Sequence, residues 1–342
     1  MIWLSWRQLR AQVVVATAAV LALAVVAVLT GPRLADLART STSVFDRLTP
    51  TDTTLFYAGV GLMALAPALV GAFLGAPLVA RELETGTYKL VWSQSVTRRR
   101  WLASKLALAV GAAALVTGAA TLAVTWWSAP LDGAVSQTRG ALPGHLTPVT
   151  FAMRGVVPVG YAVFAVVLGA ATGAVVRRTL PALAVTLALY AAVQVVVPIW
   201  VRPHLLPPVS STIAVSHATF DGLSLDGAGQ NQVSVHTGNR GDWVLVNETV
   251  GRDGRPSALP AWFRDCVPAP SAPTAGTGTE HAAAGSIDDC LARLTQAGYR
   301  QRVVYQAADR FWPLQWVETA LYLAASVVLA AGCFWWVRRR LT

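Results

Sequence analysis

The chain has 342 residues, of which 54% are hydrophobic and only 13% are charged. Soluble globular domains usually carry about 25% charged residues, and the apolar residues here come in long blocks, so an ordinary soluble protein is excluded. The formal net charge of +10 would suggest nucleic acid in a soluble protein. Because the arginines flank apolar blocks instead, the charge indicates membrane topology and no nucleic-acid partner.

The first ten residues precede an apolar block and carry tryptophans beside arginines. They predict a short helix in the membrane interface, with Trp3 and Trp6 toward the lipid and Arg7 and Arg10 toward the headgroups; a plain cytoplasmic tail is the alternative. Six segments then lack charged residues over close to the ~20 residues that a bilayer requires. They are residues 11–30, 55–80, 106–127, 155–176, 180–201 and 319–337.

These segments predict the fold class and the domain organisation. We expect an all-α polytopic membrane protein with six transmembrane helices, a short N-terminal interfacial helix and a small α+β extracytoplasmic domain. The predicted domains are residues 1–201 for the interfacial helix and spans one to five, 202–312 for the extracytoplasmic domain, and 313–342 for span six and a cytoplasmic tail.

Basic residues predict the orientation of these spans in the cell membrane. Short loops rich in Lys and Arg stay in the cytoplasm. The richer set of flanks holds Arg7, Arg10, Arg81, Lys89, Arg98, Arg99, Arg100, Lys105, Arg177, Arg178, Arg338, Arg339 and Arg340. The short segments on the other side hold Arg33, Arg39, Arg47, Arg139 and Arg154. We therefore expect a multi-pass protein of the cell membrane with both termini in the cytoplasm.

The loop between spans two and three carries the only acidic residues on the predicted cytoplasmic side, Glu82 and Glu84. They lie two residues apart, so on a helix they face different sides and do not form a paired acid/base site. Carboxylates there add nothing to topology, which favours a structural or docking role. The expected ion-pair partners are Arg81 or a partner protein.

After a turn predicted at Gly86, the loop continues with an apolar face. Tyr88, Val91 and Trp92 follow the i, i+3, i+4 spacing of a short helix, which could lie in the groove of a partner. The basic run at residues 98–100 is interpreted mainly as an anchor that keeps this loop inside the cell, with ligand binding as the alternative.

At this point the sequence resembles a known family, the ABC-2 type exporter permeases. Their cytoplasmic loop follows the pattern E-x-E-x-G-T, then P-V-S-R and a basic residue before the third span. The matching residues here are Glu82, Glu84, Gly86 and Thr87, then Ser95, Val96, Thr97 and Arg98, then Lys105. Ser95 replaces the usual proline, and the large segment before the last span looks like the form in an actinobacterial subgroup.

The resemblance implies partners and a role for the loop. By resemblance, Glu82, Glu84, Gly86 and Thr87 belong to the segment that contacts a separate cytoplasmic ATP-binding-cassette ATPase. It also implies a homodimer of permeases in the lipid bilayer and outward transport of a substrate that the sequence does not identify. The rival interpretation is a non-transporting subunit, a sensor or immunity protein, coupled to the same kind of ATPase.

The sequence lacks the motifs of an enzyme or a motor. A P-loop needs a Gly-Lys dipeptide, whereas Lys89 follows a tyrosine and Lys105 follows a serine. We find no motif for a catalytic site, a cofactor or a metal, and the histidines are scattered. No ionisable residue lies deep in a predicted span, which disfavours a self-sufficient carrier and means that the energy for uphill transport comes from another polypeptide.

Residues 202–312 are not apolar enough to span a membrane. Alternation over residues 231–250 predicts a β-hairpin, Ser286 is expected to cap a helix that stops at Gly298, and residues 299–306 are expected to form a strand. Cys266 and Cys290 both lie in this predicted outer domain, where a disulfide is favoured over two buried thiols.

Overall fold

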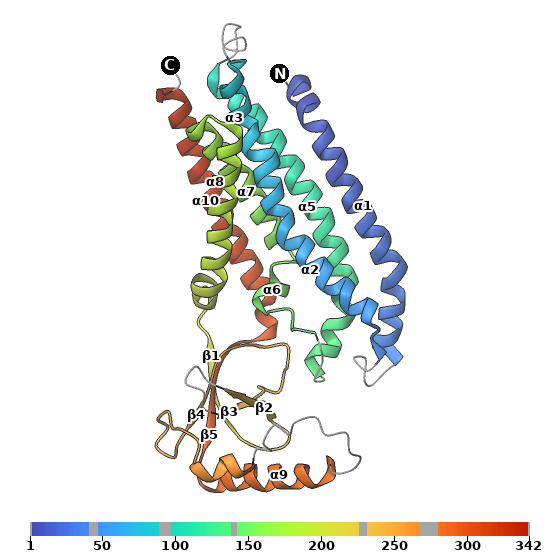
Figure 1. Ribbon diagram of the computed structural model, residues 1–342, viewed down its shortest axis with the longest axis vertical. Helices are drawn as coiled ribbons and strands as arrows, with labels where there is room; N and C mark the ends of the chain where they lie inside the picture. The colour runs from blue at the N-terminus through green and yellow to red at the C-terminus, as the bar shows by residue number, and fades with distance from the viewer. Residues whose placement is uncertain are drawn as a thin grey trace. The chain divides into compact units, whose positions relative to one another are not determined.

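The computed structural model describes residues 2–40, 47–88, 97–137, 142–225, 231–266 and 280–340. The chain divides into two compact units (Figure 1). The first unit combines Met1–Leu206 with Asp309–Thr342, and the second unit is Pro207–Ala308. Each unit is described by itself below.

The first unit is a helical bundle. Its long helices are α1 (Ile2–Thr40), α2 (Pro50–Val70), α5 (Arg98–Gln137), α7 (Val157–Val176), α8 (Thr179–Val196) and α10 (Phe311–Arg340). The π-helical turn η2 (Gly71–Gly75) joins α2 to α3 (Ala76–Thr85), the short turns η3 (Val197–Val201) and η4 (Arg202–His204) extend α8, and α6 (Pro148–Phe151) precedes α7.

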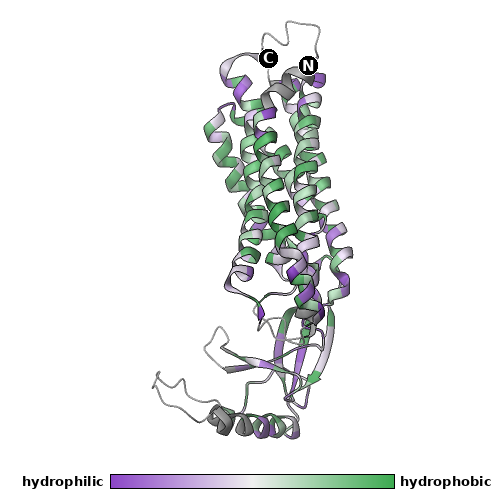
Figure 2. Ribbon diagram, turned by 90° about the vertical axis from the view of Figure 1, so that its right-hand side faces the viewer, coloured by the Kyte–Doolittle hydropathy of each residue, from purple (hydrophilic) through white to green (hydrophobic). Residues whose placement is uncertain are grey.

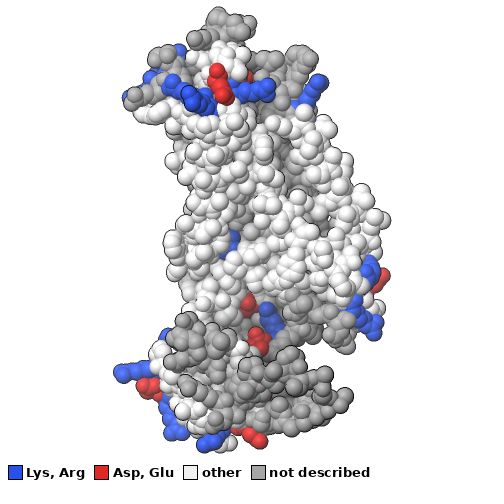
Figure 3. Space-filling model, in the orientation of Figure 1, with Lys and Arg blue, Asp and Glu red and all other residues white. Residues whose placement is uncertain are grey.

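In the part of the chain that the structure describes, six helices are long and apolar enough to cross a membrane, which confirms the predicted polytopic fold. They run over Arg10–Thr40, Pro50–Thr85, Arg98–Asp132, Val157–Val176, Thr179–His204 and Ala308–Arg339. Apolar residues dominate the middle of these helices (Figure 2), and both termini lie at the same end of the bundle (Figure 1). Charged side chains of this unit gather toward its ends, and the surface between them is mostly uncharged (Figure 3).

The predicted N-terminal interfacial helix is not a separate element. Residues 2–10 are helical, but they form the first turns of α1, which continues without a break to Thr40. The physical reason is that no glycine or proline occurs before Gly31, so nothing ends the helix between the aromatic start and the apolar span. The expectation of a short, independent helix is therefore corrected to one long helix.

Helix α7 occupies the centre of the bundle. In its apolar stretch 78% of the residues are buried, against 6% in that of α1, so α7 packs on all sides and α1 lies at the periphery. Glycines allow the backbones of α7 and the α2–α3 segment to approach closely. A Cβ atom on Gly71 would lie 2.6 Å from that of Ala165, and one on Gly75 would lie 2.6 Å from the carbonyl oxygen of Val166.

Gly169 and Gly173 of α7 meet this surface from the other side. A side chain at Gly169 would collide with the backbone of Gly71 and Ala76. The glycines of α5 differ, because a Cβ at Gly111 meets nothing within 4 Å and one at Gly118 meets a methyl group at 3.9 Å. Small residues alone do not reveal which helix faces are in contact.

We therefore expect the Gly169→Ala substitution to destabilise the bundle by ~1–3 kcal/mol, the usual cost of forcing an atom into a packed contact. The matched control is Gly111→Ala, which adds the same methyl group to a transmembrane helix where space is open. The apparent Tm of the detergent-purified variants measures the difference. Equal Tm values for both variants would contradict the close contact.

A proline in the second span explains one polar contact between α1 and η2. Pro77 has no N–H, so it cannot donate to the carbonyl of Phe73 four residues earlier. The side-chain amide of Gln12 donates to that carbonyl oxygen at 3.0 Å instead. Neighbouring helices commonly satisfy backbone groups that proline leaves free in membranes.

The second unit is a small α+β fold. Strands β1 (Val209–Ala214), β5 (Arg300–Gln306) and β4 (Trp243–Val250) form an antiparallel sheet in that order, and β2 (Phe220–Leu225) pairs with β3 (Asn231–Val235). Helix α9 (Glu280–Gln296) places Leu291 and Leu294 against Val233 and Val303 in the core of this unit. The short 3₁₀ helix η5 (Ala261–Cys266) completes it.

Two local predictions for this unit are wrong in detail. The alternating segments at 231–235 and 243–250 are strands, but β3 pairs with β2 and β4 with β5, so they do not form the expected hairpin. Alternation predicts a strand and not its partner, which is chosen by the shared core. Helix α9 begins at Glu280, before the predicted cap at Ser286, and it ends as predicted before Gly298, whose φ is 89°.

The cysteines of this unit lead to a testable expectation. Cys290 is disulfide-bonded and Cys333, in the first unit, is a buried free thiol, while the side chain of Cys266 lies outside the described residues. The pairing of Cys266 with Cys290 stays a prediction. We expect neither to react with a maleimide in the unreduced, denatured protein, and both to react after reduction. Mass-spectrometric detection of alkylated Cys266 before reduction would contradict the pairing.

Candidate functional site

The last turn of α3 carries the two carboxylates that the sequence singles out. The helix ends at Gly86, which adopts the left-handed conformation with φ of 72° that glycine tolerates best. The turn predicted at this position is therefore present. Thr87 and Tyr88 follow it, and the hydroxyl groups of Thr85 and Thr87 lie 3.0 Å apart. Val91 and Trp92 lie outside the described residues.

Glu82 is buried between α3 and α5, with 8% of its surface exposed. Its Oε1 forms an ion pair with Nζ of Lys105, and its Oε2 accepts a hydrogen bond from Nε1 of Trp101 at 3.0 Å. Trp101 is itself 1% exposed. The sequence suggested Arg81 or a partner protein as the counter-ion, whereas the structure supplies Lys105 from α5. This contact is long-range, so loop spacing alone did not reveal it.

Lys105 contacts a backbone carbonyl and an aromatic ring in addition to the Glu82 carboxylate. Its ammonium group also donates to the carbonyl of Leu78 at 3.4 Å and lies 5.2 Å from the ring centroid of Trp101. A lysine 4% exposed at the start of a membrane helix requires such partners, because an unpaired buried charge is costly. The pair therefore fixes the position of α5 relative to α3.

Glu84 faces a different helix. Its side chain is exposed, and its Oε2 accepts hydrogen bonds from the backbone N–H and the hydroxyl of Thr179, at 3.0 and 2.6 Å. Thr179 is the first residue of α8, whose N–H groups lack partners within the helix. A carboxylate there also interacts favourably with the helix dipole. Glu84 therefore caps α8 from a neighbouring helix.

The two carboxylates thus connect α3 to two different helices, in keeping with their spacing. Glu82 holds the start of α5, and Glu84 holds the start of α8. The end of α3 is therefore in contact with two neighbouring helices through Glu82 and Glu84, and we call this set of contacts the joint. It does not have the chemistry of a catalytic site, and the described residues contain no group of three His, Cys, Asp or Glu side chains that could hold a metal ion.

A second polar cluster lies inside the first unit, and the sequence analysis missed it. Arg202 of η4 and Glu318 of α10 form a bidentate ion pair, with Nε to Oε2 at 2.7 Å and Nη2 to Oε1 at 2.9 Å. Both side chains are 0% exposed. The hydroxyl of Tyr161 on α7 donates to Oε1 of Glu318 at 2.5 Å, and the guanidinium group stacks 4.4 Å from the ring centroid of Phe151.

Glu318 lies one residue before the uncharged block 319–337, and Arg202 lies one residue after the block 180–201. In the sequence they look like separate charges at span ends, which does not reveal that they meet. The available signal was that a positive and a negative residue flank consecutive apolar blocks. Gln194 of α8 accepts a hydrogen bond from the hydroxyl of Tyr322 at 2.8 Å, so it bridges α8 and α10.

A family model described as "ABC-2 membrane transporter related" matches residues 9–202, which is more than half of the chain and covers the first five apolar helices almost entirely. The chain belongs to this ABC-2-related family. No curated protein and no solved structure matches the chain.

Membership in the ABC-2-related family makes the chain a multi-pass membrane component of an ABC transport system and implies partnership with an ATP-binding-cassette subunit. Glu82, Glu84 and Gly86 are among the residues expected to couple this ABC-2-related protein to its ATPase. All three lie at the end of α3. Thr87 and Tyr88 continue from this turn.

Proposed function

We propose that this chain is the membrane-spanning permease subunit of an ABC exporter. It moves an unidentified substrate outward, driven by a separate cytoplasmic ATPase that contacts residues 81–105. Two copies of the chain form the transport path between them, with both termini and the end of α3 in the cytoplasm.

This proposal rests mainly on the joint at the end of α3, where Glu82 contacts α5 and Glu84 contacts α8. An ATPase that pushes on residues following Gly86 moves the last turn of α3. Since Glu82 is tied to α5 and Glu84 to α8, that movement reaches three membrane helices at once. The α3 segment continues α2 through η2 and packs on the central α7 through glycines, so rigid contacts extend from the joint into the bundle.

The distribution of basic residues supports the proposed orientation. Arg98, Arg99 and Arg100 begin α5 beside the joint, and Arg338 and Arg339 lie near the end of α10. Positive residues next to membrane helices favour the cytoplasmic side. The joint therefore faces the compartment where ATP is available.

The test is ATP-driven transport by the purified complex. We expect the chain to co-purify with an ATP-binding-cassette ATPase. In inside-out vesicles, ATP should cause a compound from a cell extract to accumulate in the lumen, as identified by comparative mass spectrometry. A complex with a hydrolysis-deficient ATPase is the control. ATP hydrolysis without accumulation of any compound would favour the non-transporting subunit instead.

A further inference from the structure

A basic cavity lies between the start of α5 and the end of α10. Its volume is about 680 Å³, and it is lined by Arg99 and Arg100 from α5 and Arg338 from α10, together with Thr97, Ala103 and aromatic residues. A smaller cavity of about 210 Å³ shares Arg99 and Arg338. No carboxylate is among the described residues that line either cavity.

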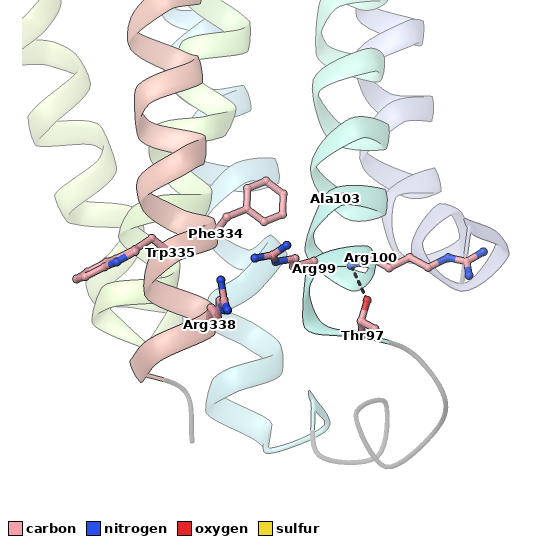
Figure 4. A pocket seen from close by; sticks show the side chains of 7 residues that line it. All are labelled: Thr97, Arg99, Arg100, Ala103, Phe334, Trp335 and Arg338. Atoms are coloured by element: carbon pink, nitrogen blue, oxygen red, sulfur yellow. Dashed lines mark hydrogen bonds between the residues drawn. The ribbon is translucent and has the colours of Figure 1, made fainter.

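Two of these arginines converge. Figure 4 shows the side chains of Arg99 and Arg338 pointing toward one another across the space between the helices, while that of Arg100 extends away. Both converging side chains belong to exposed residues. Like charges that face each other repel, so an anion between them lowers the energy of this arrangement. Guanidinium groups bind phosphate with paired hydrogen bonds.

Apart from Thr97, the remaining side chains that line the cavity are mainly apolar. The ring of Phe334 lies beside the two guanidinium groups (Figure 4), and Ala103 lines the wall one turn along α5. Trp335, 50% exposed, stands next to Phe334 on α10, and tryptophan favours the headgroup level of a bilayer. A binding partner that matches this lining has a phosphate at one end and hydrocarbon at the other.

We propose that this cavity binds an anionic phospholipid, with its phosphate between Arg99 and Arg338 and its acyl chains along Phe334 and Ala103. Arginines that only set topology need to lie near a membrane boundary, but they need not converge from two helices on one cavity. A free phosphate ion would satisfy the charges and leave the apolar wall unused. An acidic protein surface would satisfy the arginines without matching the apolar side chains of Phe334 and Ala103.

The experiment compares two double variants of the full chain in detergent. Arg99→Gln with Arg338→Gln removes the converging pair. Arg10→Gln with Arg81→Gln removes the same charge from exposed arginines outside the cavity. Each protein is titrated with phosphatidylglycerol, phosphatidylcholine and inorganic phosphate, and bound lipid is counted by native mass spectrometry. The shift in Tm gives a second readout.

We expect wild type to bind phosphatidylglycerol more tightly than phosphatidylcholine. The affinity for phosphatidylglycerol should fall about tenfold in the cavity variant and less than about twofold in the control, because charge-assisted hydrogen bonds are lost only in the first. Equal losses in both variants would overturn the proposal. Inorganic phosphate that binds as tightly as phosphatidylglycerol would also overturn it, because that result indicates a site for a free anion. Equal affinity of wild type for phosphatidylglycerol and phosphatidylcholine would overturn it as well.

Discussion

The Glu318→Ala variant is expected to lose ~3–5 kcal/mol of stability, the usual cost of leaving one member of a buried ion pair without its partner. Arg202 would keep its charge at a position that is 0% exposed, with its Nε and Nη2 donors deprived of the carboxylate. The result would appear as a large fall in Tm in detergent and as reduced membrane-inserted protein in cells.

Two controls separate the charge from the loss of side-chain volume. The double variant Arg202→Met with Glu318→Leu removes both charges and fills the space, so we expect it to recover most of the stability. Arg33→Ala breaks the ion pair with Asp52, in which the arginine side chain is 52% exposed, and should cost less than ~1 kcal/mol. A double variant as unstable as Glu318→Ala would show that the pair is not the cause.

The second large effect is expected at the joint. Glu84→Ala should reduce ATP-driven transport about tenfold while leaving the amount of folded protein unchanged, because coupling between sites typically amounts to ~1–3 kcal/mol. Glu84 is exposed, so its removal leaves no buried charge. The measurement is transport and ATP hydrolysis by the reconstituted complex, with the ratio of the two as the degree of coupling.

A double-mutant cycle with Thr179→Val tests whether Glu84 acts through α8. Thr179→Val removes the hydroxyl contact and keeps the backbone N–H donor, so its own loss should be smaller. If Glu84 acts through α8, the combined variant should be no worse than Glu84→Ala alone, because Glu84→Ala already removes both contacts. Asp36→Ala, which removes an exposed carboxylate from α1, is the matched control. Strictly additive losses, or an equal loss in the Asp36 variant, would contradict the proposed path.

Glu82 is less suitable for such a test than the sequence suggested. Its replacement by alanine would leave the buried Lys105 unpaired, so a loss of transport would mix uncoupling with a loss of stability. The two carboxylates look equivalent in the sequence and differ sharply in burial. We therefore assign the test of coupling to Glu84 and a structural role to Glu82.

Much of the membrane fold could be predicted because it depends on local composition. A bilayer accepts only segments that are apolar over a sufficient length, so the six spans are visible as uninterrupted apolar blocks. Their ends were less certain: the helices extend past the apolar blocks, as in α1 and α10, since charged turns beyond the hydrocarbon remain helical.

The sequence by itself determined the class of protein, the number of spans, the turn at Gly86 and the opposite directions of Glu82 and Glu84, because each depends on residues close together in the chain. Only the tertiary structure decided the partners: Lys105 and Trp101 for Glu82, Thr179 for Glu84, and Glu318 for Arg202. The last two pairs are 95 and 116 residues apart. Such contacts arise from the packing of whole helices, which no local pattern specifies.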